Sequence, residues 1–106
     1  MGTVGDMDIS VEHNRDRRRF EAMLDGRLVG FADYVPRDGA FAFTHTEVDP
    51  AERGRGIGGA LVGAALDAVR AEGGRVLPLC SFVADYVARH PAYAELVAHR
   101  PDPGGA

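Results

Sequence analysis

The sequence predicts an α/β (α+β) fold in which a mixed, mostly antiparallel sheet begins as a β-meander and continues into an α-β-α segment. The first half alternates apolar and polar residues and contains two Asp-Gly pairs, which suit tight hairpin turns. The second half changes to helical spacing at Gly56. The length of 106 residues, with 45% hydrophobic residues, fits one small domain.

Four strands are expected in the first half, because β-rich runs are separated there by turn signals. They are a short strand around Ile9 and Val11 and longer strands over residues 19–24, 28–35 and 40–48. Asp25-Gly26 and the segment 36–39 are the turn signals, since Gly and the Asp before it tolerate positive φ. The last three strands therefore form an antiparallel meander.

The second half is expected to contain helices around one strand. Residues 56–72 have apolar residues three and four apart and end at a pair of glycines, as a helix does. A buried strand over 76–80 follows, and Ser81 is the expected N-cap of a second helix. His90-Pro91 ends that helix before a last short one over 92–98. The strand–helix–strand crossover makes its two strands parallel.

Composition limits the function classes. Residues 1–7 and 99–106 are predicted to be loose tails around a domain over 8–98. Cys80 is the one cysteine, so no intramolecular disulfide is expected, and no metal site either. The net charge of −4 disfavours nucleic acid as a partner. No apolar run approaches the ~20 residues of a membrane span, so we expect no membrane partner and a cytoplasmic location.

The segment that connects the last meander strand to the long helix carries the strongest functional signal. Residues 53–58 read Arg-Gly-Arg-Gly-Ile-Gly. Glycines let backbone N–H groups approach a ligand, and a helix N-terminus attracts an anion. The sequence therefore predicts a phosphate site, and the alternative is a loop that only turns a tight corner. A formal dinucleotide pattern ends at Gly59, but three antiparallel strands precede it, which is the wrong context.

The spacing Arg53-x-x-Gly56-x-Gly58 after a strand resembles the acetyl-CoA loop of the GNAT superfamily of N-acyltransferases. With the segments Cys-Ser-Phe-Val at 80–83 and His-Pro-x-Tyr at 90–93, the chain is similar to the small single-domain YjdJ-like branch, over about residues 9–97. The resemblance implies a reduced GNAT fold with CoA between two splayed strands. The cofactor contacts expected on this basis are Val48, Arg53, Gly54, Arg55, Gly56, Ile57, Gly58, Ser81, His90 and Tyr93.

Acetyl transfer to an amine needs a base, because an alkylammonium with a pKa of ~10 is not nucleophilic. Glu47 is the first candidate, near the end of the strand that leads into the loop. His45 shares its strand face and could be the base or orient Glu47. Both could instead be solvated residues, and Glu47 could simply offset Arg53 or Arg55.

Three further side chains are candidates for the transfer step. Cys80 lies between a strand end and a helix start, where a thiol pKa is lowered. It could carry the acyl group, line the acetyl pocket, which we favour, or be a small buried residue. Tyr86 and Tyr93 could protonate the leaving thiolate, and Tyr86 is expected to pack in the core. The arginine cluster at 15–19 is expected to be solvated, with a CoA phosphate contact as the alternative.

The expected function is acetyl-CoA-dependent N-acyl transfer, directly to a primary amine of a small molecule, peptide or protein. A net charge of −4 favours a cationic acceptor, since an acidic surface concentrates cations. Two alternatives are a non-catalytic CoA-binding regulatory module and a partner-binding domain with a vestigial loop.

Overall fold

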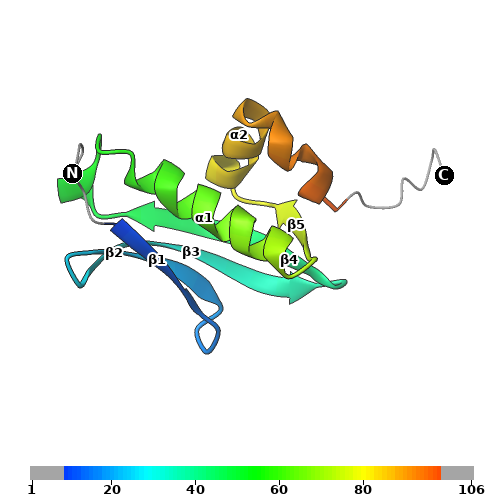
Figure 1. The fold of residues 1–106 in the computed structure, drawn as a ribbon, viewed down its shortest axis with the longest axis horizontal. Coiled ribbons are helices and arrows are strands. Elements are labelled where there is room, and N and C mark those ends of the chain that lie inside the picture. Colours follow the sequence, from blue (N-terminus) through cyan, green and yellow to red (C-terminus); the bar gives the residue numbers. More distant parts are fainter. Residues whose placement is uncertain (1–8, 99–106) are drawn as a thin grey trace.

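The structure, a computed structural model, describes residues 9–98 and consists of a five-stranded sheet with two α-helices against one face (Figure 1). In chain order its elements are β1 (Ile9–Asn14), β2 (Arg19–Leu24), β3 (Arg27–Arg37), β4 (Ala40–Val48), the 3-10 helix η1 (Pro50–Glu52), α1 (Ile57–Ala71), β5 (Arg75–Pro78), α2 (Ser81–Arg89) and the 3-10 helix η2 (Pro91–Leu96). Neighbouring strands follow chain order, antiparallel except for the parallel β4–β5 pair. The predicted fold class is confirmed, and the two predicted tails lie outside the described residues.

Both predicted Asp-Gly turns form. Asp25 and Asp38 each have a φ of +52°, and the glycine after each has a φ of +80°, as a type I′ hairpin turn requires. The second turn is shorter than the predicted segment 36–39, because β3 continues to Arg37. Pro36 is tolerated in the strand because β2 pairs with β3 only as far as Asp33, so β3 has a single neighbour there.

The core lies between the sheet and α1. Helix α1 buries one apolar side, made of Ile57, Leu61, Val62, Ala65, Leu66 and Val69. From the sheet it meets Phe20, Ala22, Leu24, Val29, Ala32, Tyr34 and Phe43. All of these side chains are under 8% exposed, so the predicted helix and meander are held together by apolar burial. No helix within residues 9–98 is long and apolar enough to cross a membrane.

The segment after α1 differs from the prediction in its boundaries. Strand β5 ends at Pro78 rather than residue 80, because proline cannot donate to the ladder. The N-cap of α2 is therefore Cys80, and Ser81 is the first helical residue. The last helix is a 3-10 helix that starts at Pro91, not an α-helix over 92–98.

Helix α2 packs against α1 through glycines. A Cβ atom on Gly58 would lie 2.5 Å from the Phe82 ring, and one on Gly63 would lie 2.6 Å from the Tyr86 hydroxyl. A side chain at either position would force the facing ring of α2 to shift, because real Cβ atoms do not approach so closely. Gly58, predicted from the sequence as a cofactor contact, therefore also makes room for a ring of α2.

Strand β4 separates from β5 midway along its length. The parallel ladder ends at the pair Phe43–Pro78, and a bulge at the next residue, Thr44, shifts the register of β4 against β3. A bulge bends its strand and increases the twist. The last part of β4 therefore has a free edge on the side of β5, as the sequence resemblance implied.

Candidate active site

The glycine loop (residues 53–59) leads from the end of η1 into α1. Gly54 and Gly56 have φ values of +86° and +78°, and a Cβ on either residue would meet nothing within 4 Å. Gly56 is the N-cap and makes no side-chain cap, so the first helical N–H groups remain unpaired by the helix. The first helical bond runs from the Ala60 N–H to the Gly56 carbonyl oxygen, at 3.0 Å. The loop is thus an open backbone cradle for an anion.

Two details of this cradle differ from the expectation. The Arg53 N–H donates to the Pro50 carbonyl oxygen at 3.3 Å, so it caps η1 and only the later amides stay available. The carboxylate that offsets Arg55 is Glu52, at 3.4 Å, and not Glu47. Glu52 also accepts a hydrogen bond from Arg27 at 3.1 Å. Sequence reasoning missed Glu52, which is 8% exposed and fastens the loop to the start of β3.

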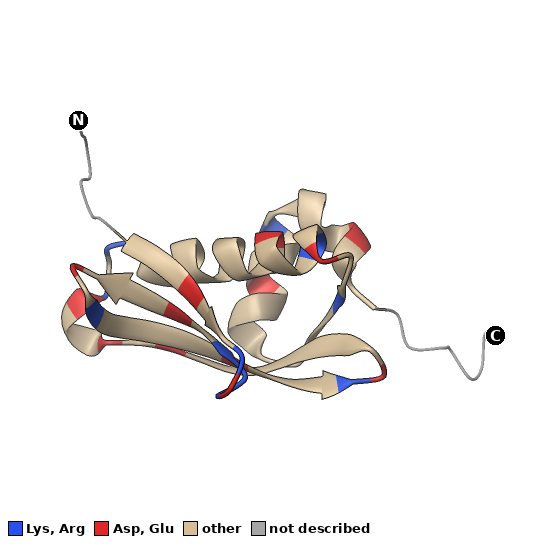
Figure 2. Ribbon diagram, turned by 60° about the horizontal axis from the view of Figure 1, so that its bottom comes forward, with Lys and Arg blue, Asp and Glu red and all other residues tan. Residues whose placement is uncertain are grey.

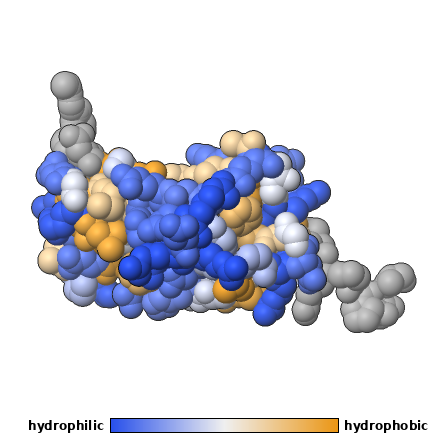
Figure 3. All heavy atoms as spheres, turned by 90° about the horizontal axis from the view of Figure 1, so that it is seen from below, coloured by the Kyte–Doolittle hydropathy of each residue, from blue (hydrophilic) through white to orange (hydrophobic). Residues whose placement is uncertain are grey.

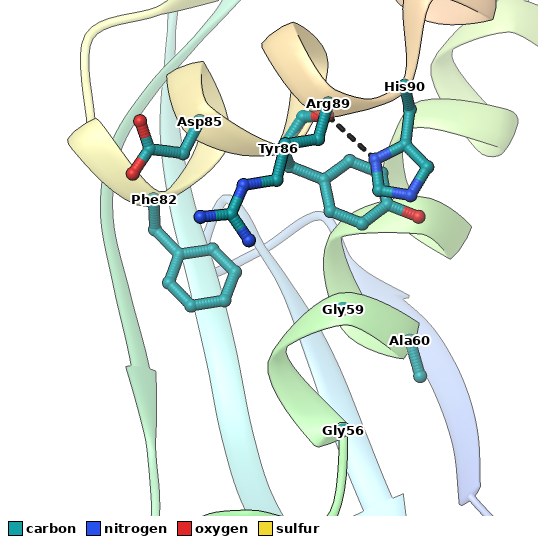
Figure 4. A pocket seen from close by; sticks show the side chains of 8 residues that line it. All are labelled: Gly56, Gly59, Ala60, Phe82, Asp85, Tyr86, Arg89 and His90. Carbon is teal, nitrogen blue, oxygen red and sulfur yellow. Dashed lines mark hydrogen bonds between the residues drawn. The ribbon is translucent and has the colours of Figure 1, made fainter.

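Two hollows meet at the start of α1. The helix groove, about 650 Å³, lies between α1 and α2 (Figure 4) and is lined by Gly56, Gly59, Ala60, Phe82, Asp85, Tyr86, Arg89 and His90. The strand groove, about 520 Å³, lies between β4 and the glycine loop, and its lining includes Thr46, Glu47, Val48, Arg53, Gly54 and Ile57. Both share Gly56, Gly59 and Phe82, so they form one continuous surface across the Phe82 ring.

The helix groove contains a cation that the sequence analysis did not select. The Arg89 guanidinium points toward Phe82 (Figure 4), and Arg89 lines the same groove as Gly56 and Gly59 at the start of α1. Beside it, the His90 ring stacks on Tyr86 with 3.9 Å between ring centroids, and its Nδ1 donates to the Tyr86 carbonyl oxygen at 2.8 Å. The helical spacing of Phe82, Tyr86 and Arg89 was the sequence signal for this wall.

The candidate catalytic residues occupy both faces of the free part of β4. The His45 and Glu47 side chains are 54% and 63% exposed, and His45 Nε2 lies 3.2 Å from Glu47 Oε2. Thr46, between them, faces the helices, and the Cys80 Sγ lies 3.5 Å from its hydroxyl oxygen. The structure thus brings together His45 with Glu47, and Cys80 with Thr46. A group lying along the free edge of β4 can be reached from both faces.

Neighbouring groups shift the pKa of the Cys80 thiol. Burial acts to raise the pKa of this thiol, but hydrogen bonds from the Thr46 side chain and from nearby backbone N–H groups outweigh it, so the pKa is lowered. This is the direction that the position before a helix predicts. The thiolate fraction of Cys80 is therefore larger, at any pH below its ordinary pKa of 9.0, than that of a free cysteine.

We expect Cys80 to react with iodoacetamide faster than free cysteine at neutral pH, because the thiolate is the nucleophile. The rate measured against pH should have its midpoint below 9.0, and Thr46→Val should move that midpoint upward. A Thr46→Ser variant keeps the hydroxyl and serves as the control. Equal midpoints in the Thr46→Val variant and the wild type would contradict this account.

The remaining predicted residues lie elsewhere. The Tyr93 hydroxyl donates to Asp67 at 2.7 Å, which is the main cause that raises the Tyr93 pKa to about 12. Asp67 lies about three helical turns along α1 from Gly56, so the structure does not bring Tyr93 to Cys80 or Glu47. Ser81 is not among the residues that line the two grooves. Ile57 lines the strand groove, but its side chain is buried in the core.

The arginine cluster at 15–19 is also distant from the glycine loop. Arg15 pairs with Glu72, just after the far end of α1, at 2.5 Å. Arg19 pairs with Asp33 at 2.9 Å within the sheet. Neither arginine reaches the two grooves, so the structure gives no support to a phosphate contact there. Among residues 9–98, no group of three His, Cys, Asp or Glu side chains could hold a metal.

A mixed sheet in which β4 and β5 separate, together with a glycine loop that leads into α1, defines an acyltransferase-like domain. Residues 19–96 match the family described as GCN5-related N-acetyl-transferase. The chain belongs to this family, whose members transfer acyl groups.

Known proteins resemble this chain in sequence and in structure. It is 41% identical over 86 residues to "Protein NATD1" of Mus musculus, covering 78% of this chain and 77% of that one. The match to "Protein NATD1" of Danio rerio is 35% over 102 residues, covering 88% and 92%. The structure is similar to an aminoglycoside acetyltransferase from an uncultured soil metagenomic sample, solved in complex with trehalose, at 20% identity and a TM-score of 0.50. That match covers 79% of this chain and 60% of the other, and it shows the fold alone.

Proposed function

We propose that this chain transfers an acetyl group from acetyl-CoA to a primary amine. The observation that carries the proposal is the open backbone at Gly54 and Gly56: both line the strand groove, and Gly56 also lines the helix groove, which contains Arg89. Two phosphates linked as a pyrophosphate need several N–H donors and positive charge, and the loop and Arg89 provide both. A Cβ at either glycine would enter this space, so the residues present fit the group.

Each part of the site has a role in this proposal. Acetyl-CoA, when bound, would supply the thioester carbonyl that the amine attacks. The carbon–sulfur bond would break, and CoA would leave with the second proton of the attacking nitrogen. The amides after Arg53 bind phosphate, and Val48 and the free edge of β4 flank the pantetheine arm. Glu47 takes the proton from the incoming ammonium, and His45 orients its carboxylate from 3.2 Å. Cys80 and Thr46 line the acetyl pocket from the other face of β4.

The test is a calorimetric titration with acetyl-CoA, followed by a turnover assay that detects released CoA with lysine-containing peptides and small primary amines. Stoichiometric binding with turnover supports the enzyme. Binding without turnover for any amine would favour the non-catalytic regulatory module. Absence of binding at millimolar acetyl-CoA would overturn the assignment of the glycine loop.

We expect Arg89→Ala to weaken acetyl-CoA binding about three- to tenfold, because a partly exposed ion pair with phosphate is lost. The matched control is Arg37→Ala at the exposed end of β3, which removes the same charge far from the grooves. Raising the salt concentration should reduce the difference between wild type and the Arg89 variant, because salt screens exposed charges. If both arginine variants bind like the wild type, Arg89 is not a cofactor contact.

A further inference from the structure

We infer that the sheet face opposite the helices docks a basic polypeptide segment and presents one of its lysines to Glu47. The inference rests on the proposed acetyl transfer and names its acceptor class. Helices α1 and α2 lie together on one face of the sheet, and neither packs on the other, which we call the open face (Figure 2). Hydrophilic side chains cover the middle of this face, with smaller apolar patches toward its ends (Figure 3).

One cross-strand row runs over the open face to the candidate base. The strand register pairs Glu12 with Glu21, Glu21 with Phe31, and Phe31 with Glu47. These residues alternate with core residues such as Phe20 and therefore share the open face. With strands ~4.8 Å apart, the row spans roughly 14 Å from Glu12 to Glu47.

The neighbouring row leaves this surface negatively charged. It pairs Asn14 with Arg19, Arg19 with Asp33, and Asp33 with His45. The Arg19 guanidinium forms an ion pair with Asp33 and lies 3.9 Å from the Phe31 ring centroid. Its charge is therefore already compensated, and its planar face is covered by the Phe31 ring. Within residues 9–98, no basic side chain forms an ion pair with Glu12 or Glu21.

Placing Glu12 opposite Glu21 costs stability, because like charges directly across a ladder repel. A bound basic side chain would remove this repulsion. The charge of the row therefore complements a cationic partner.

The row ends at a hollow that can receive a side chain. The outer hollow, about 320 Å³, lies beside Glu47 and Phe31 and is also lined by Leu28, Val48 and Arg53. Leu28 is 45% exposed and, with Phe31, offers an apolar wall for the methylenes of a lysine. Glu47 also lines the strand groove, so this residue connects the outer hollow with the proposed cofactor site.

A polypeptide fits this surface better than a small amine does. Small ligands are usually enclosed by a concave pocket, whereas most of the row lies on an open sheet. The outer hollow accommodates one side chain, and Glu21 and Glu12 extend away from it at strand spacing. The arrangement therefore suits a lysine in the hollow with further basic residues beside it along the row.

The test measures binding of labelled peptides by fluorescence anisotropy at low salt, without acetyl-CoA. One peptide has a central lysine flanked by arginines, and the other has the same lysine flanked by serines. We expect the arginine-flanked peptide to bind more tightly, and Glu12→Gln/Glu21→Gln to weaken it about tenfold. The control is Glu95→Gln on η2, which removes one charge from a side chain that is 80% exposed.

Two further readouts separate docking from a structural role. The double variant should raise KM for the arginine-flanked peptide and leave kcat unchanged, and its thermal stability should stay equal or rise, because the repulsion between the two carboxylates is gone. Equal affinity of the two peptides, or equal affinity of wild type and double variant, would overturn the inference. Spermidine binding as tightly as the peptide would replace the polypeptide with a small polyamine and would also overturn it.

Failure of the proposed function has a different signature. If the chain lacks acetyl-CoA binding or turnover, peptide binding can still depend on Glu12 and Glu21. If the docking inference alone fails, the serine-flanked peptide is acetylated as efficiently as the arginine-flanked one.

Discussion

Gly56→Val should abolish measurable acetyl-CoA binding while the chain still folds. Valine places its Cβ in the space where Gly56 now has nothing within 4 Å, and this space opens into both grooves. Phosphate would then lose at least two charge-assisted hydrogen bonds of about 1.5–3 kcal/mol each, which corresponds to a hundredfold or more in affinity. Calorimetric titration with acetyl-CoA measures this loss.

Backbone strain is the competing explanation for such a loss, and it can be matched. A valine at a φ of +78° costs about 1–3 kcal/mol wherever it is placed. Gly39 in the β3–β4 turn has a φ of +80° and likewise nothing within 4 Å. Gly39→Val should therefore lower the unfolding temperature similarly and bind acetyl-CoA normally. Normal binding by the Gly56 variant would instead remove the glycine loop from the site.

Glu47→Gln should lower kcat by about 10²–10⁴-fold, the usual contribution of a general base, with acetyl-CoA affinity unchanged. Glutamine keeps the size of the side chain and its place in the outer hollow, but it cannot take the proton from the ammonium. Because the Glu47 side chain is 63% exposed, the substitution should not affect folding. Steady-state kinetics with a lysine peptide measures kcat, and calorimetry measures cofactor affinity.

The control and the partner residue refine this prediction. Glu95→Gln changes the same functional group on η2 and should leave kcat unchanged. His45→Gln should reduce kcat less than Glu47→Gln, because His45 positions the carboxylate and does not accept the proton itself. An undiminished kcat in the Glu47 variant would exclude Glu47 as the base. A larger loss from His45→Gln would reverse the two roles.

Local signals were sufficient for most of the fold and for the glycine loop. Two Asp-Gly turns set the β2–β3 and β3–β4 hairpins, since positive φ at both central residues selects that turn type. Period-two alternation gave β2 and β4 their observed boundaries, and helical spacing gave α1 to within one residue at each end. The sequence could predict an open backbone at Gly54 and Gly56, because the missing Cβ is a property of the glycine itself.

Only the tertiary structure decided which side chains contact one another, because these contacts depend on strand register and on packing between segments that are distant in the sequence. The bulge at Thr44 and the end of the ladder at Pro78 free the edge of β4 and bring Cys80 to Thr46, on the face opposite Glu47. The packing of α2 against α1 places Arg89 in the same groove as Gly56.

Other predicted roles were changed by contacts that no local pattern encodes. Tyr93 pairs with Asp67, and Glu52 rather than Glu47 offsets Arg55. The row from Glu12 to Glu47 exists only because four strands pair in one register, and a slip of one residue would turn each of its side chains to the other face. The sequence by itself therefore determined the elements, the loop and the family, whereas register and helix packing determined the composition of the site.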